Sequence, residues 1–121
     1  TDALEKLLKE LTDPKRKGKS EALPAVLVAL GDVAFIKLDY RKARWYYLTV
    51  IVQHSTDRSM VARAHYMAGM CYEKLREKSR ESQALTRALR HYTIVTKDFK
   101  DSLEFAEASK KLEALKARIG A

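Results

Sequence analysis

The sequence predicts an all-α protein built from antiparallel helix pairs. Three observations support this class. Apolar residues recur at helical spacing through most of the 121 residues, only four glycines and two prolines are present, and the breaks between apolar segments are short. Short connections place consecutive helices side by side in opposite directions. The length fits one domain with a single modest core.

The N-terminal segment predicts one short amphipathic helix. Leucines at positions 4, 7, 8 and 11 have i, i+3, i+4, i+7 spacing, so they share one face of a helix over 4–11. Asp13 and Pro14 end it, and a basic, glycine-containing run follows. We therefore expect a short helix and linker over 1–19 and a helical domain over 20–121.

The second helix is expected to be buried on more than one side. Ser20 can cap it, and Pro24 is tolerated in its first turn. The segment 25–38 carries only two charged residues, and a helix that is apolar all round needs cover on several sides. Asp39 then offers a break and a cap for the next helix.

Four further helices follow by the same period. The third covers 40–54; its β-branched stretch at 49–52 could alternatively form a strand, but the 3.6-residue period upstream favours helix. The fourth runs from Ser59 to Lys78. The remaining two are expected from Ser79 or Ser82 to Phe99, and from Ser102 or Phe105 to Ile119.

Composition favours binding over chemistry. The formal net charge is +8, which raises the hypothesis of a nucleic-acid or other polyanionic partner, although most acidic residues alternate with basic ones as on a solvated helical surface. No stretch of about 18 apolar residues predicts a membrane span. The single Cys71 excludes an internal disulfide and lies in an apolar stretch, which predicts a buried thiol.

The remaining reactive residue types form no recognisable site. The histidines at positions 54, 65 and 91 have no i, i+4 partner, so we interpret each as a helix-surface or turn residue. No glycine-rich phosphate loop or nucleophile elbow is present. We therefore expect no enzymatic activity, no cofactor and no metal.

The sequence contains an internal repeat. The spacing Ala-x3-Tyr-x2-Val occurs twice, and a small-residue step with glycine precedes each occurrence, at Leu30-Gly31 and at Ala68-Gly69. The turns that follow, 54–57 and 99–102, also correspond. The repeated residues are Ala43, Tyr47 and Val50 in the first unit and Ala88, Tyr92 and Val95 in the second.

These residues resemble the tetratricopeptide repeat (TPR) family, whose pattern is W-x2-L-G-x2-Y, then A-x3-F, then P, over about 34 residues. The matching residues are Leu27, Leu30, Gly31, Ala43 and Tyr47 in one unit and His65, Ala68, Gly69, Tyr72, Ala88 and Tyr92 in the other. The last helix would begin a third unit, with Ala114 at the glycine position. The resemblance implies an α-helical solenoid of about two repeats, with a C-terminal capping helix and the short N-terminal helix.

The wording around the first turn is similar to bacterial envelope repeat proteins of the Tol-Pal and outer-membrane assembly type. That similarity implies a periplasmic or cell-envelope adaptor. Those proteins usually carry Tyr-Pro in the turn, where this chain has His54-Ser55 and Phe99-Lys100. The compartment therefore stays open, and a cytoplasmic location is the alternative.

The second unit is longer than the first. Gly31 and Ala43 are 12 positions apart, whereas Gly69 and Ala88 are 19 apart. The excess of about two turns, shared as one turn per helix, would keep the helix faces in register. The overhang at 77–83 would then project as a basic, polar knuckle, which is a candidate contact site.

In the TPR family the first helix of each pair lines the concave face. The resemblance implies a partner-binding face made of Val28, Asp32, Phe35, Arg63, Tyr66, Met70, Glu73 and Lys111. Tyrosine and methionine supply adaptable contact area that suits an extended peptide or a helix with apolar anchors. Members that clamp a terminal carboxylate use asparagine where this chain has Asp32 and Met70, so that activity is not implied.

The predicted function is a non-enzymatic protein-protein interaction scaffold. The N-terminal helix or a second copy could cover the face instead, and self-association is expected of so short an array. The alternative is a nucleic-acid or polyanion-binding domain, whose binding would weaken steeply with salt. Its candidate residues are Tyr40, Arg41, Arg44, Trp45, Tyr46, Arg87 and Arg90.

Overall fold

The computed structural model describes residues 2–13, 21–81 and 83–120, which form six α-helices and no strand. This confirms the all-α class, and the 49–52 stretch is helical. The helices are α1 Asp2–Leu11, α2 Leu23–Ile36, α3 Tyr40–Gln53, α4 Arg58–Ser79, α5 Ala84–Asp98 and α6 Phe105–Gly120. The predicted caps Ser20 and Ser82 lie outside the described residues. No helix in the described ranges has the length and apolar character needed to cross a bilayer.

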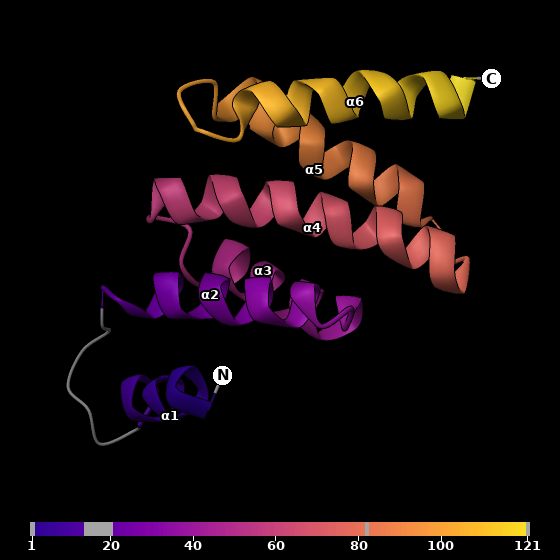
Figure 1. Cartoon of the computed structure of the whole chain (residues 1–121). Coiled ribbons are helices and arrows are strands. Elements are labelled where there is room, and N and C mark those ends of the chain that lie inside the picture. The colour runs from indigo at the N-terminus through magenta and orange to yellow at the C-terminus, as the bar shows by residue number, and fades with distance from the viewer. Residues whose placement is uncertain (1, 14–20, 82, 121) are drawn as a thin grey trace.

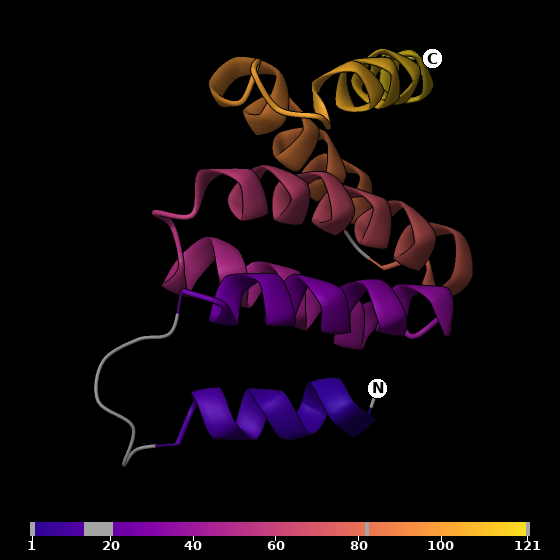
Figure 2. The ribbon, with the colours of Figure 1, turned by 60° about the vertical axis from the view of Figure 1, so that its left-hand side comes forward.

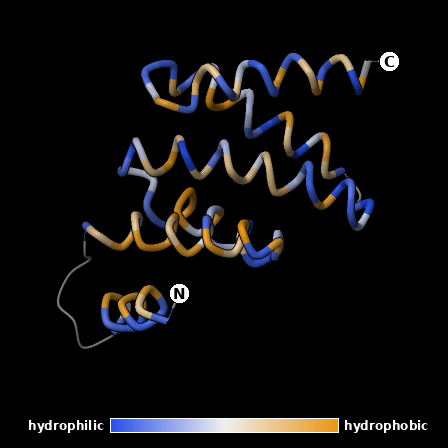
Figure 3. Tube along the Cα trace, in the orientation of Figure 1, coloured by the Kyte–Doolittle hydropathy of each residue, from blue (hydrophilic) through white to orange (hydrophobic). Residues whose placement is uncertain are grey.

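Consecutive helices run in opposite directions and each packs against the next (Figure 1). In addition, α2 packs against α4, while α1 lies along α2 on the side away from α4 (Figure 2). Helix α2 is therefore covered by α1, α3 and α4. This explains why it is apolar along most of its length (Figure 3), as the sequence predicted.

Side-chain caps fix the starts of two helices. The Asp39 carboxylate accepts a hydrogen bond from the backbone N–H of Lys42 at 3.2 Å, as predicted for α3. At α4, Asp57 accepts in the same way from the N–H of Met60 at 3.3 Å. Helix α5 starts differently, because Gln83 has a φ of 62° and provides no side-chain cap.

The internal repeat of the sequence recurs in the local geometry. The repeated Ala, Tyr and Val side chains of α3 and α5 are all fully buried. The two helices also end alike: the His54 N–H donates to the Val50 carbonyl at 2.9 Å, and the Phe99 N–H donates to the Val95 carbonyl at 3.1 Å. The same positions therefore do the same structural work in both units.

Each unit brings a tyrosine ring against a helix backbone at a glycine. A Cβ added at Gly31 would lie 2.6 Å from Cε1 of Tyr47, and one at Gly69 would lie 2.5 Å from Cε1 of Tyr92. Real Cβ atoms do not approach other atoms so closely. These two glycines are therefore required for the close packing of α2 on α3 and of α4 on α5.

The extra residues of the second unit lie mostly in α4. Helix α4 continues ten residues beyond Gly69, whereas α2 continues five beyond Gly31, so the excess is not shared as one turn per helix. The chain then turns at Arg80, whose φ is 49°. Glu81 folds back onto α3, where its carboxylate lies 2.5 Å from Nη1 of Arg44. The expected knuckle is thus attached to α3.

Candidate functional site

Two predicted site residues, Asp32 on α2 and Arg63 on α4, form an ion pair. Arg63 Nη2 donates to Asp32 Oδ2 at 3.0 Å, and the Tyr47 hydroxyl donates to Asp32 Oδ1 at 2.5 Å. Arg63 Nη1 also lies 4.0 Å from the carboxylate of Glu104, just before α6. We call these four residues the Asp32 network; it joins α2, α3, α4 and the start of α6.

The second unit repeats this arrangement around Glu73, another predicted site residue. The Tyr92 hydroxyl on α5 donates to Glu73 Oε2 on α4. Nη1 of Arg118 on α6 lies 3.7 Å from Glu73 Oε1. We call these three residues the Glu73 network. In both networks a carboxylate on the first helix of a pair binds a tyrosine on the second helix and an arginine on the following first helix.

The two tyrosine hydroxyls act as permanent donors. Burial, followed by the hydrogen bond to Asp32, raises the pKa of Tyr47 far above its ordinary value of 10. Burial and the bond to Glu73 do the same for the pKa of Tyr92. Both phenols therefore stay protonated and hold their carboxylates in place at all physiological pH values.

We expect Tyr92→Phe to destabilise the fold by about 1 to 2 kcal/mol, because the partly buried Glu73 carboxylate loses a hydrogen-bond donor. Denaturant unfolding measures this. The matched control is Tyr46→Phe, since the buried Tyr46 has no hydroxyl hydrogen bond to a described residue. Equal free energies of unfolding for the two variants would contradict a structural role for the Tyr92 hydroxyl.

The predicted residues Tyr66 and Met70 lie between the two networks along α4. Positions 63, 66, 70 and 73 have the 3, 4, 3 spacing of a single helix face, and the side chains at 66 and 70 are half-buried. The Tyr66 ring is 6.1 Å from that of Tyr92. Burial, together with the Glu107 carboxylate on α6, raises the pKa of Tyr66. We call Arg63, Tyr66, Met70 and Glu73 the α4 face.

The other predicted residues lie apart from these contacts. Phe35 is half-buried and meets the ring of Tyr40 edge-on at 5.2 Å. Lys111 is half-exposed on α6. Val28 is only 4 % exposed and belongs to the hydrophobic core, so it offers no accessible surface to a partner. Its assignment to the binding face is corrected accordingly.

A pocket of about 440 Å³ opens beside the Asp32 network. It lies between the first turns of α4 and the connection from α5 to α6, and Arg63 and Glu104 are part of its wall. Its apolar wall includes Met60, Phe99 and Leu103, and Leu103 is 96 % exposed. An apolar side chain of a partner could enter here next to the Arg63 guanidinium.

Sequence reasoning missed the hydroxyls of Tyr47 and Tyr92, as well as Glu104 and Arg118. A signal existed for the hydroxyls, because the family pattern has phenylalanine where this chain has tyrosine in both units. Two hydroxyls at equivalent buried positions predict two polar partners. No such signal exists for Glu104 and Arg118, which reach the networks only through the placement of α6.

Two histidines are buried together, which corrects their interpretation as surface or turn residues. His65 is only 7 % exposed, and its Nδ1 lies 2.9 Å from Nδ1 of the half-buried His91. His54, by contrast, does lie at the turn after α3. The pair belongs to a column of rings and guanidinium groups between α4 and α5: Arg44, Tyr72, His91, His65, Phe99 and Arg58.

The reactive groups of the described chain are held in neutral, buried forms. Cys71 is fully buried, as predicted, and burial raises its pKa to about 12, so the thiol stays protonated at neutral pH. Among the described residues, no three or more His, Cys, Asp or Glu side chains gather as metal ligands would. The polar groups of the site are thus arranged to hold helices and to present a surface.

Comparisons with protein-family models, with curated proteins and with solved structures found no match to this chain. The argument for a repeat is therefore internal to the molecule. It rests on the two glycine-tyrosine contacts, the two equivalent helix ends and the two carboxylate networks.

Proposed function

We propose that the chain is a non-enzymatic, TPR-type scaffold that binds a peptide or helix of a partner protein. In this proposal the pairs α2–α3 and α4–α5 are the repeats, α6 is the capping helix, and the partner lies along α2, α4 and α6. The observation that supports it best is the repeated carboxylate, tyrosine and arginine arrangement. It holds the three first helices at fixed positions and leaves Tyr66 and Met70 half-exposed between the two networks.

The chemistry of the α4 face favours a partner with apolar anchors. Arg63 and Glu73 are already paired with opposite charges, so a partner gains little from them by charge alone. Tyr66 and Met70 offer adaptable apolar surface, and the pocket beside Arg63 could hold a further apolar side chain.

The polyanion alternative has less support. Tyr40 and Tyr46 are buried, and Arg44 is paired with Glu81. Of the expected stacking residues only Trp45 remains available, at 59 % exposure. Binding by this route would decline steeply with salt, whereas capture of an apolar peptide segment would not.

The test is a peptide selected from a random display library on the wild-type protein, whose affinity is then measured for a Tyr66→Ala, Met70→Glu variant. We expect the variant to bind at least about tenfold more weakly, a loss of roughly 1.4 kcal/mol. Its unfolding midpoint should change little, because both side chains are only half-buried.

The matched control is Trp45→Ala, Val52→Glu, which alters exposed apolar residues on α3. Peptides that bind the α4 face should bind this control like the wild type. Peptides lost only from the control, or selection solely of acidic, salt-labile peptides, would contradict the proposal and favour the α3 surface.

A further inference from the structure

Helix α1 is held only weakly. Leu4, Leu8 and Leu11 contact the core as partly buried side chains, but no residue of α1 is buried. A ten-residue helix is shorter than the roughly 12 to 15 residues at which isolated helices become even marginally stable in water. Helix α1 therefore depends on its contact with α2, and that contact is thin.

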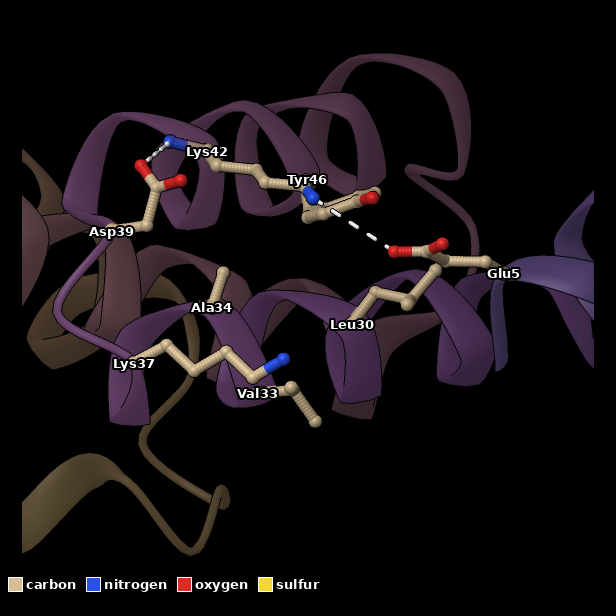
Figure 4. A pocket seen from close by; sticks show the side chains of 8 residues that line it. All are labelled: Glu5, Leu30, Val33, Ala34, Lys37, Asp39, Lys42 and Tyr46. Atoms are coloured by element: carbon tan, nitrogen blue, oxygen red, sulfur yellow. Dashed lines mark hydrogen bonds and ion pairs between the residues drawn. The ribbon is translucent and has the colours of Figure 1, made fainter. Parts of the chain in front are cut away.

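The surface under α1 extends further than α1 itself. Helix α2 has 14 residues against the ten of α1. A pocket of about 210 Å³ remains open next to Glu5, between the C-terminal half of α2 and the start of α3 (Figure 4). Its apolar lining comes from Leu30, Val33, Ala34 and Tyr46. We call this surface of α2 and α3, including the pocket, the α1 seat.

The open end of the α1 seat is lined by two lysines. Lys42 Nζ lies 3.8 Å from the Glu5 carboxylate, the ion pair drawn in Figure 4. Lys37 also lines the pocket and forms no ion pair with a described residue. Asp39 is close by, but its carboxylate is occupied with capping α3. The seat is thus complementary to an apolar helix face with carboxylates near one end.

We propose that the α1 seat is a second binding site, which takes an amphipathic helix of a partner protein in place of α1. The partner helix is longer than α1 by at least one turn, has leucines at i, i+3, i+4 and i+7, and carries carboxylates in its first turn. The added turn fills the pocket and brings acidic groups to Lys37 and Lys42. Helix α1 is the internal occupant, and it lowers the apparent affinity of the site until it is displaced.

The probe is a fluorescently labelled peptide that copies residues 2–11 and adds one N-terminal turn with one leucine in register and two glutamates. It is titrated into the full-length wild type and into a Leu4→Glu, Leu8→Glu variant, whose α1 no longer fits the seat. We expect at least about tenfold tighter binding to the variant, because the internal competitor is gone.

Charge reversal identifies the site. Lys37→Glu, Lys42→Glu should weaken binding of the peptide, and a peptide with lysines in place of the two added glutamates should recover it. Equal affinity for the wild type and the α1 variant, or no effect of the lysine reversals, would overturn the proposal. So would dimers built by exchange of α1 between copies, detected by light scattering, because the occupant would then be a second copy.

A photo-crosslinker in the added turn decides the matter on the wild type if the α1 variant does not unfold cooperatively. Crosslinks to residues 30–37 support the proposal, and crosslinks to α4 or α6 overturn it. Because the α4 face lies outside the seat, the Tyr66→Ala, Met70→Glu variant should bind this peptide like the wild type.

Discussion

Gly69→Leu is expected to unfold the protein. A Cβ at position 69 would lie 2.5 Å from Cε1 of Tyr92, whose ring is fully buried and whose hydroxyl is bound to Glu73. The ring therefore has no free space to move into. Inserting a few methylenes into a packed core costs about 1 to 3 kcal/mol, and here the insertion separates two helices. The total is comparable with the roughly 5 to 15 kcal/mol that stabilise a typical domain.

A thermal melt followed by circular dichroism tests this, with Ala106→Leu as the control. Ala106 is an exposed position on α6, so the same side chain there should leave the midpoint nearly unchanged. A cooperative melt of Gly69→Leu near the wild-type midpoint would mean that α4 and α5 do not pack as described. Gly31→Leu should behave like Gly69→Leu, because Tyr47 occupies the equivalent position.

The repeated core could be predicted because its signals are local in the sequence. The spacing of Ala43, Tyr47 and Val50 fixes one face of α3, and small residues upstream leave room for the ring. Asp39 could be predicted as a cap for the same reason, since its hydrogen bond spans three residues. Helix boundaries and the all-α class followed from such short-range patterns.

Choices between neighbouring positions could not be predicted. Trp45 and Tyr46 are adjacent, large and aromatic, yet Tyr46 is buried and Trp45 is exposed. Successive residues point about 100° apart around a helix, so only the placement of α3 decides which one packs inward. The extension of α4 beyond Gly69 is similar: its length is visible in the sequence, but its division between helices depends on where Glu81 meets Arg44.

The buried histidines escaped prediction because their partners lie on two helices. His65 is seven residues from both Arg58 and Tyr72, so the three share one face of α4, but the sequence does not say what that face meets. In the structure it meets His91, with Arg87 of α5 and Arg44 of α3 over the ring of Tyr72.

Acidification from pH 7.5 to about 4.5 is therefore expected to destabilise the protein strongly. Burial, opposed weakly by Asp98, lowers the pKa of His65 from 6.5 to about 4. Burial, then His65 and Arg90, lowers the pKa of His91 to about 4 as well. Above pH 6.5 both rings are neutral in the folded and unfolded chain. As pH falls from 6.5 toward 4, the unfolded chain binds protons that the folded chain does not, so stability is lost through this window.

The loss by about pH 4.5 should be roughly 2 to 3 kcal/mol for each histidine, since one pKa unit corresponds to about 1.4 kcal/mol. Urea unfolding across this range measures it. His65→Phe, His91→Phe keeps two rings in the column but removes their titration, so its free energy of unfolding should depend much less on pH. His54→Gln, which changes the histidine outside the column, should retain the wild-type dependence.

Carboxylate titration falls in a lower window and does not obscure this result. The hydrogen bond from Arg58 lowers the pKa of Asp101 below its ordinary 3.8, so any contribution of that pair is lost only under more acidic conditions. A double-phenylalanine variant that still lost the wild-type amount of stability between pH 6.5 and 4.5 would show that the two imidazoles are not held neutral by the α4–α5 interface. A flattened profile would locate the acid sensitivity of the fold at one contact, the pair of Nδ1 atoms that must share a single proton.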